Sequence, residues 1–257
     1  MIIVFDIDGV VRDVGNSYRR ALADTVEEFT LGGYRPTPED IDRLKSEGIW
    51  NNDWEGSQEL IYRYFESQGK IRDEIELNYA AIVEFFQSRY RGTDGENFNG
   101  YITTEPLLLQ AKYLETLSEN GIAWGFFSGA TRGSAEYVLS GRLGLENPVL
   151  IAMEDAPGKP DPTGLFETVK QLEIKHNLAA NSPVFYAGDT VADMYTVEKA
   201  KALQPRRTWI GIGILPPHVQ SSPERKESYA EQLKQAGATI VLGNVQELNS
   251  ERVHQLI

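Results

Sequence analysis

The sequence predicts an α/β fold in which a parallel sheet is covered by helices on both faces. From about residue 105 onward, short apolar runs of strand length alternate with amphipathic helical segments. This alternation is typical of parallel strands joined by helical crossovers. The apolar run Ile2–Phe5 is a further strand, but no other strand-like run follows it for about a hundred residues. We therefore expect an all-helical unit to be inserted between the first strand and the rest of the sheet.

The inserted helical unit is expected to form a cap domain beside an α/β core. The predicted boundaries are residues 1–13 and 100–257 for the core and residues 14–99 for the cap. Asn16 is placed to cap the first helix, which Gly32 and Gly33 would end. Further helices in this unit are expected at 38–47, 55–67 and 72–90. The polar, glycine-containing stretch 92–100 is interpreted as a linker.

The core elements follow in regular order after the linker. Each expected strand is a short apolar run, and each expected helix has apolar residues at helical spacing. The strands are expected at 122–127, 149–152, 184–187, 209–214 and 239–242. The helices are expected at 106–119, 134–143, 163–176, 192–202, 224–235 and 245–256.

Composition excludes several classes of function. The 257 residues carry a formal net charge of −13, which disfavours nucleic acid and anionic membranes as partners. Cysteine is absent, so disulfides, thiolate metal sites and a cysteine nucleophile are excluded. The three histidines lie in segments without other catalytic signals. The first apolar run is interrupted by Asp6 and follows no basic stretch, so we expect no secretory signal and a cytoplasmic protein.

The most informative motif is the pair Asp6 and Asp8 at the end of the first strand. Side chains two residues apart in a strand point the same way, so both carboxylates should approach one site. Their repulsion would be relieved by a hard cation such as Mg²⁺, which proteins hold with carboxylates and substrate phosphate oxygens. An EF-hand loop is excluded because Val11 and Ser17 occupy the positions that need glycine and an acid.

Three further groups lie where ligands bind in an open α/β sheet, beyond the carboxyl ends of its strands. Ser128 and Gly129 follow the second apolar run and offer a hydroxyl and backbone amides. Lys159 lies in a proline-containing loop, where it adds a cation to an acidic protein. Asp189 and Asp193 follow a third strand and are spaced four apart, so both can face one cation or simply cap a helix.

Taken in order, these motifs resemble those of the haloacid dehalogenase-like (HAD) superfamily, in particular its phosphatases with an inserted helical cap. The motif D-x-D-G-V matches Asp6–Val10, and the serine and lysine motifs match Ser128 and Lys159. The motif G-D-x-x-x-D matches Gly188–Asp193. The resemblance covers nearly the whole chain and implies a Rossmann-like α/β core.

The resemblance also implies the roles of the reacting groups. Asp6 would be the nucleophile that takes the phosphoryl group as an aspartyl-phosphate. Asp8 would protonate the leaving oxygen and then activate the hydrolytic water. Ser128, Gly129 and Lys159 would bind the phosphate and neutralise its charge. The substrate is therefore expected to be a small phosphate ester.

The cofactor implied by the resemblance is Mg²⁺. Its ligands would be the carboxylates of Asp6 and Asp189 and the backbone carbonyl of Asp8. Asp193 would contact the ion directly or through water.

Two alternative functions remain open. A phosphomutase of the same superfamily keeps the same residues, and a catalytically idle metabolite-binding protein would keep the same fold. Asp8 argues against a dehalogenase, because halide leaves without a proton. The phosphonatase branch uses a cap lysine, for which Lys45 is the nearest candidate, but nothing around it indicates a depressed pKa.

A segment of the helical unit and two arginines offer candidate contacts with the rest of the substrate. The stretch 48–54 combines aromatic, amide and carboxylate groups, and Asn52 and Asp53 are its candidate substrate-binding residues. Arg12 and Arg132 follow two of the motifs and are candidates for binding a substrate carboxylate or second phosphate.

Overall fold

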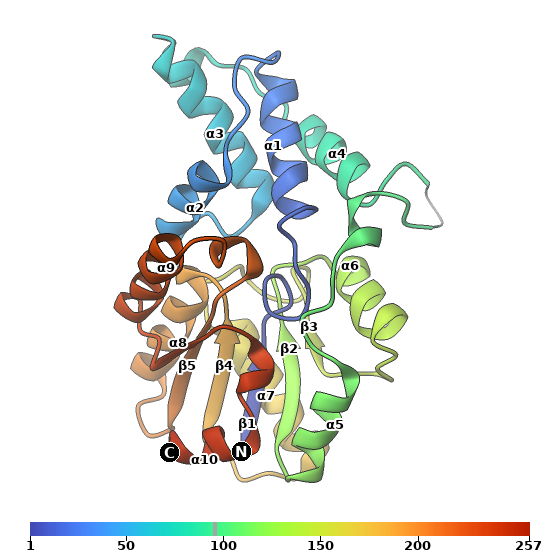
Figure 1. Cartoon of the computed structure of the whole chain (residues 1–257), viewed down its shortest axis with the longest axis vertical. Coiled ribbons are helices and arrows are strands. Elements are labelled where there is room, and N and C mark those ends of the chain that lie inside the picture. Colours follow the sequence, from blue (N-terminus) through green and yellow to red (C-terminus); the bar gives the residue numbers. More distant parts are fainter. Residues whose placement is uncertain (95–96) are drawn as a thin grey trace. The chain divides into compact units, whose positions relative to one another are not determined.

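The computed structural model describes residues 1–94 and 97–257 (Figure 1). The chain divides into two compact units, one of Met1–Asp13 with Pro106–Ile257 and one of Val14–Glu105. The second division lies at 105/106, whereas the sequence prediction put it at 99/100. Residues 95 and 96, which belong to the predicted linker, lie outside the described residues.

The first unit is built on a six-stranded sheet whose strands all pair in parallel, which confirms the predicted α/β fold class. The strand order is β3-β2-β1-β4-β5-β6, so the first strand of the chain lies in the interior of the sheet. The strands are β1 Ile2–Phe5, β2 Ala123–Phe127, β3 Leu150–Ile151, β4 Val184–Gly188, β5 Trp209–Ile214 and β6 Ile240–Leu242.

Helices cover both faces of this sheet, as Figure 1 shows for the lower part of the picture. Alternation along β1 sends Ile3 and Phe5 into one hydrophobic cluster and Ile2 and Val4 into another. The first cluster is closed by residues of α5 and α10, and the second by residues of α7 and α8. The helices are α5 Ala111–Glu119, α6 Arg132–Glu136, α7 Thr163–His176, α8 Val191–Leu203, α9 Pro223–Gln235 and α10 Ser250–Gln255.

The second unit contains only helices and irregular segments among its described residues. A tight aromatic cluster forms part of its core, in which the Tyr18 ring lies 4.1 Å from that of Tyr90 and 5.3 Å from that of Phe86, centroid to centroid. Its helices are α1 Tyr18–Phe29, α2 Pro38–Ser46, α3 Asp53–Ser67 and α4 Tyr79–Tyr90, with 3₁₀ turns at Arg72–Glu74 and Tyr101–Thr104.

Three predicted helices are shorter than expected, each for a local reason. The helix predicted at 245–256 is a 3₁₀ turn, Val245–Glu247, followed by α10, because Asn249 caps α10 by accepting a hydrogen bond from the Arg252 amide. The helix predicted at 72–90 is a 3₁₀ turn followed by α4, because Asn78 caps α4 by accepting a hydrogen bond from the Ala81 amide. The helix predicted at 106–119 begins only at Ala111. Its first residues instead pair with the loop after β1, where the Leu108 amide donates to the Val11 carbonyl at 2.8 Å.

No helix among the described residues is both long and apolar enough to cross a membrane.

Close packing of α7 on the sheet generates a stability prediction at Gly164. A Cβ at this position would lie 2.2 Å from the Phe127 ring. Alanine is favoured over glycine in a helix by up to about 1 kcal/mol, but overpacking of this kind costs about 1–3 kcal/mol. We expect Gly164→Ala to lower the free energy of unfolding, measured by denaturant titration. Gly141→Ala is the matched control because its Cβ would meet nothing closer than 4.0 Å; equal stability of the two variants would contradict the packing argument.

Candidate active site

The carboxyl ends of β1 and β4 bring two of the sequence-predicted acids together. Phe5 pairs with Ala187 in the parallel register, and the Asp6 amide donates to the Ala187 carbonyl at 2.8 Å. Asp6 follows β1, and Asp189 follows β4. One oxygen each of Asp6, Asp189 and Asp193 lie within 4.8 Å of one another, and all three residues are buried.

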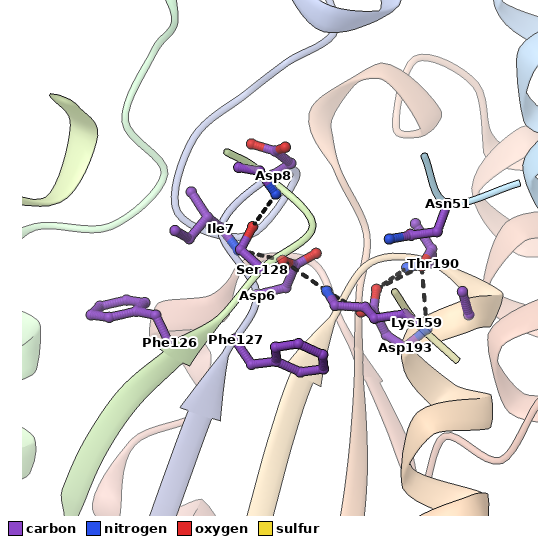
Figure 2. A network of polar contacts seen from close by, with 12 residues as sticks. Asp6, Ile7, Asp8, Asn51, Phe126, Phe127, Ser128, Lys159, Thr190 and Asp193 are labelled. Atoms are coloured by element: carbon purple, nitrogen blue, oxygen red, sulfur yellow. Dashed lines mark hydrogen bonds and ion pairs between the residues drawn. The ribbon is translucent and has the colours of Figure 1, made fainter. Parts of the chain in front are cut away.

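Lys159 belongs to the loop that precedes α7, and its side chain lies between Asp6 and Asp193 (Figure 2). Its ammonium group lies 2.9 Å from Asp6 Oδ1 and 2.7 Å from Asp193 Oδ1. The aromatic rings of Phe127 and Tyr186 lie beside it, with centroids 5.3 and 5.4 Å from Nζ. The lysine side chain is only 1% exposed, so its charge is held almost entirely by protein groups.

Two residues that the sequence interpretation did not select hold Asp193 in place. Thr190 and Asp193 form a capping box at the start of α8, in which the Thr190 amide and hydroxyl both donate to Asp193 Oδ2. The Tyr186 hydroxyl lies 3.0 Å from Asp193 Oδ1. The T-x-x-D spacing was a visible capping signal, whereas nothing in the sequence indicated that Tyr186 faces this cluster.

Burial and neighbouring charges raise the pKa of Asp189 but leave that of Asp193 lowered. Burial alone would raise the pKa of Asp193, but Lys159 and the hydrogen bonds from Thr190 hold that pKa below its usual range. Burial, followed by repulsion from Asp193, raises the pKa of Asp189 well above its usual range. Within the described part of the chain, no basic side chain lies within salt-bridge distance of Asp189. The lysine therefore compensates Asp193 far better than Asp189.

The loop after β1 places Asp8 beside Arg12. Arg12 Nε donates to Asp8 Oδ1 at 2.6 Å, and the Arg12 residue is completely buried. A side chain with no exposed surface is not available to a substrate in this structure, in contrast to the substrate-binding role expected from the sequence.

Ser128 and Gly129 follow β2, the strand that neighbours β1 on the side opposite β4. The Ser128 amide donates to the Ile151 carbonyl at 3.0 Å, and its hydroxyl accepts from the Ala130 amide at 3.1 Å. The parallel register sets Ser128 one residue beyond the level of Asp6, because Phe5 pairs with Phe126. These contacts fix the serine at the edge of the sheet where the acids lie.

The remaining sequence candidates have local partners. Asn52 caps α3 by accepting hydrogen bonds from the amides of Trp54 and Glu55. Asp53 pairs with Lys45 at 2.7 Å, so the lysine is the partner of a carboxylate rather than an isolated amine. Arg132 is partly exposed and forms ion pairs with Glu136 and Asp155. These contacts account for the side chains without a substrate.

The buried carboxylates fit a divalent metal ion by their chemistry. Three carboxylates and one ammonium group give the cluster a net formal charge of −2 if all are ionised. Carboxylate oxygens are the ligands that hard cations such as Mg²⁺ prefer. Together with the hydroxyl of Ser128 at the same edge of the sheet, this is a donor set suited to phosphoryl chemistry.

Comparisons with solved structures support the fold. Phosphatase Tt82 from Thermococcus thioreducens is 24% identical, with a TM-score of 0.62 over 83% of this chain and 93% of that chain. A HAD family hydrolase from Deinococcus radiodurans R1, solved with bound phosphate and sodium, is 18% identical, with a TM-score of 0.62 over 100% of this chain and 96% of that chain. At these identities the likeness shows the fold alone.

Comparisons of sequence identify the family as well as the fold. An imidazoleglycerol-phosphate dehydratase from Phytophthora nicotianae is 30% identical over 248 residues, which are 93% of this chain and 49% of that protein. The chain thus spans about half the length of this curated relative. Residues 1–201 match the haloacid dehalogenase-like hydrolase family, and this match confirms the resemblance found in the motifs. The chain therefore belongs to the haloacid dehalogenase-like hydrolases.

Proposed function

We propose that this hydrolase is a Mg²⁺-dependent phosphatase of a small phosphorylated metabolite, acting through an aspartyl-phosphate on Asp6. The observation that carries the proposal is the buried ion-pair system in which Lys159 joins Asp6 and Asp193 beside Asp189. It supplies a nucleophile, a cation for the phosphate and a set of metal ligands at one edge of the sheet.

The proposed metal ligands are the carboxylates of Asp6 and Asp189 and the backbone carbonyl of Asp8. Asp193 is assigned to the water-mediated role, because both of its oxygens already have partners in Thr190, Tyr186 and Lys159. When bound, Mg²⁺ would neutralise charge on the phosphate oxygens.

Asp6 is held in an orientation that suits nucleophilic attack. The Ile7 amide donates to Asp6 Oδ1 at 2.7 Å, and Lys159 contacts the same oxygen. We assign attack on phosphorus to Oδ2, for which the described residues provide no hydrogen-bond donor. The new bond joins Oδ2 to phosphorus while the bond from phosphorus to the leaving oxygen breaks.

The other site residues complete the two steps. Asp8 gives its proton to the leaving oxygen, so the product departs as an alcohol. Asp8 then takes a proton from a water molecule, which attacks phosphorus, releases inorganic phosphate and restores the Asp6 carboxylate. Ser128, Gly129 and Lys159 bind the phosphate oxygens through both steps.

The helical unit is proposed as the cap that selects the substrate's leaving group. The name of the curated relative concerns a phosphate ester that carries an imidazole ring. Because this chain aligns with about half of that protein, we give imidazole-bearing alcohol phosphates such as histidinol phosphate first place among the substrates to test. Phosphoglycolate and sugar phosphates complete the panel.

The proposed reaction predicts phosphate release from one or more of these esters in the presence of Mg²⁺. Chelation of the metal and the substitution Asp6→Asn should each abolish release, because one removes the neutralising charge and the other the nucleophile. Asp161→Asn is the control, since the Asp161 carboxylate accepts a hydrogen bond from the Thr163 amide at the start of α7 and is not part of the cluster. Identification of the products separates the phosphatase from a mutase: phosphate that reappears on another carbon, with none released to water, would contradict the proposal.

The close approach of Gly9 to Asp189 predicts how metal binding can be lost without removing a ligand. Gly9 has φ +75°, and a Cβ there would lie 2.1 Å from Asp189 Oδ2. We expect Mg²⁺ to raise Tm of the wild type, by roughly 5–10 °C at 100 times Kd. Gly9→Ala should lose most of this increase because the methyl group displaces the carboxylate.

Gly121→Ala is the matched control for this metal-binding test. Gly121 has φ +72°, so alanine suffers the same backbone strain, but no atom lies within 4 Å of its Cβ. This variant should have a lower Tm, by the equivalent of about 1–2 kcal/mol, and an unchanged response to Mg²⁺. An unchanged response in Gly9→Ala would count against Asp189 as a ligand.

The cap of α3 predicts a separation between stability and substrate binding at Asn52. Asn52→Ala should destabilise the helical unit by about 1 kcal/mol, measured by thermal unfolding, because it removes the acceptor for two helix amides. Asn52→Asp retains a capping oxygen and should keep Tm close to that of the wild type. If Asn52 also binds substrate, kcat/KM will fall in Asn52→Asp; an unchanged kcat/KM would limit the residue to capping.

A further inference from the structure

Arg12 is a charged side chain with no exposed surface, and it forms an ion pair with Asp8, the proposed acid and base. Arg12 Nε and Nη2 each lie 2.6 Å from Asp8 Oδ1. The Asp8 side chain is 25% exposed, whereas that of Arg12 is 0% exposed. Both contacts fall on one oxygen, so Oδ2 is the oxygen of Asp8 that remains for proton exchange. A buried guanidinium keeps such a pairing because leaving either charge alone is costly.

The backbone of Arg12 is fixed from both sides. Within the loop, the Arg12 amide donates to the Ile7 carbonyl at 3.2 Å, and the Arg12 carbonyl accepts from the Gly9 amide at 2.9 Å. The neighbouring Val11 carbonyl accepts from the Leu108 amide, and Arg12 itself forms an antiparallel bridge with Leu107. The backbone that carries the guanidinium is therefore rigid, and a residue that positions another side chain requires this rigidity.

We propose that Arg12 is a positioning residue that orients the Asp8 carboxylate for proton transfer to the leaving oxygen; this inference rests on the proposed phosphatase reaction. Arg12 holds Oδ1, and Asp8 presents Oδ2 to the leaving group. The guanidinium touches neither the substrate nor the phosphorus. Without it, Asp8 can rotate, and proton delivery becomes slower while nucleophilic attack by Asp6 is preserved.

The leaving group distinguishes this role from a merely structural one. An alkyl phosphate expels an alkoxide that needs a proton, whereas p-nitrophenyl phosphate expels an anion that is already stable. The parameter to compare is kcat/KM, because it reports the steps up to departure of the leaving group and not hydrolysis of the intermediate. We expect Arg12→Gln to reduce kcat/KM for the best alkyl phosphate of the panel by roughly 10- to 100-fold, and to reduce that for p-nitrophenyl phosphate far less.

Two further variants show whether Arg12 acts through Asp8. In an Asp8→Asn background, Arg12→Gln should cause no additional loss of kcat/KM on the alkyl phosphate, since the group that it positions is already inactive. Arg12→Lys keeps the charge and should recover part of the activity on the alkyl phosphate. If Arg12→Gln does not fold, Arg12→Lys replaces it in the double-mutant comparison with Asp8→Asn.

Arg207→Gln is the control, because Arg207 is also largely buried and paired with a carboxylate, Glu173, but lies outside the site. It should lower Tm without altering the ratio of the two kcat/KM values.

The outcomes separate the positioning role from the reaction on which it rests. Equal losses on the two esters, or independent effects of Arg12→Gln and Asp8→Asn, would overturn the role of Arg12 and leave the phosphatase proposal intact. If the wild type released phosphate from neither ester with Mg²⁺, the proposed function itself would fail, and the positioning role with it.

Discussion

The site depends on the buried ammonium group of Lys159 between the carboxylates of Asp6 and Asp193. Breaking a buried ion pair by removing one partner costs several kcal/mol, because it leaves an uncompensated charge. Here one cation, from the loop before α7, is shared between Asp6, which follows β1, and Asp193 of α8. The need to neutralise this one buried cation therefore holds together segments that are far apart in the sequence. The same requirement leaves Asp189 without a contacting cation among the described residues, which is why the cluster suits a metal ion.

The strand order explains why this ion pair can form. β1 lies between β2 and β4, so the residues that follow these three strands meet at one edge of the sheet. Aspartates follow β1 and β4, and a serine follows β2. Gly9 is required at the centre, because any side chain there would collide with Asp189. The loop after β1 can then be compact enough to hold Asp8 against Arg12.

Hydrogen bonds and ion pairs with nearby residues explain several polar side chains that the sequence had made candidates for substrate binding. Asn52 accepts hydrogen bonds from amides at the start of α3, Asp53 pairs with Lys45, and the partly exposed Arg132 pairs with two acids. Arg12 differs from these because its partner is a proposed reacting group. Family membership thus agrees with the residues that share the central cluster.

The sequence by itself determined the fold class, the helical insertion and the positions of the motif residues, because apolar periodicity and short motifs are local properties. It also predicted α7 at its observed bounds, since the apolar spacing there is uninterrupted. The helix predicted at 72–90 was wrong at its start, because Asn78 caps α4 and the residues before it form a separate 3₁₀ turn. Only the tertiary structure revealed that Arg12 is buried against Asp8, that Tyr186 supports Asp193, and that Lys159 is shared by two acids. Burial and partnership between distant residues depend on how the strands pair, and no local pattern encodes them.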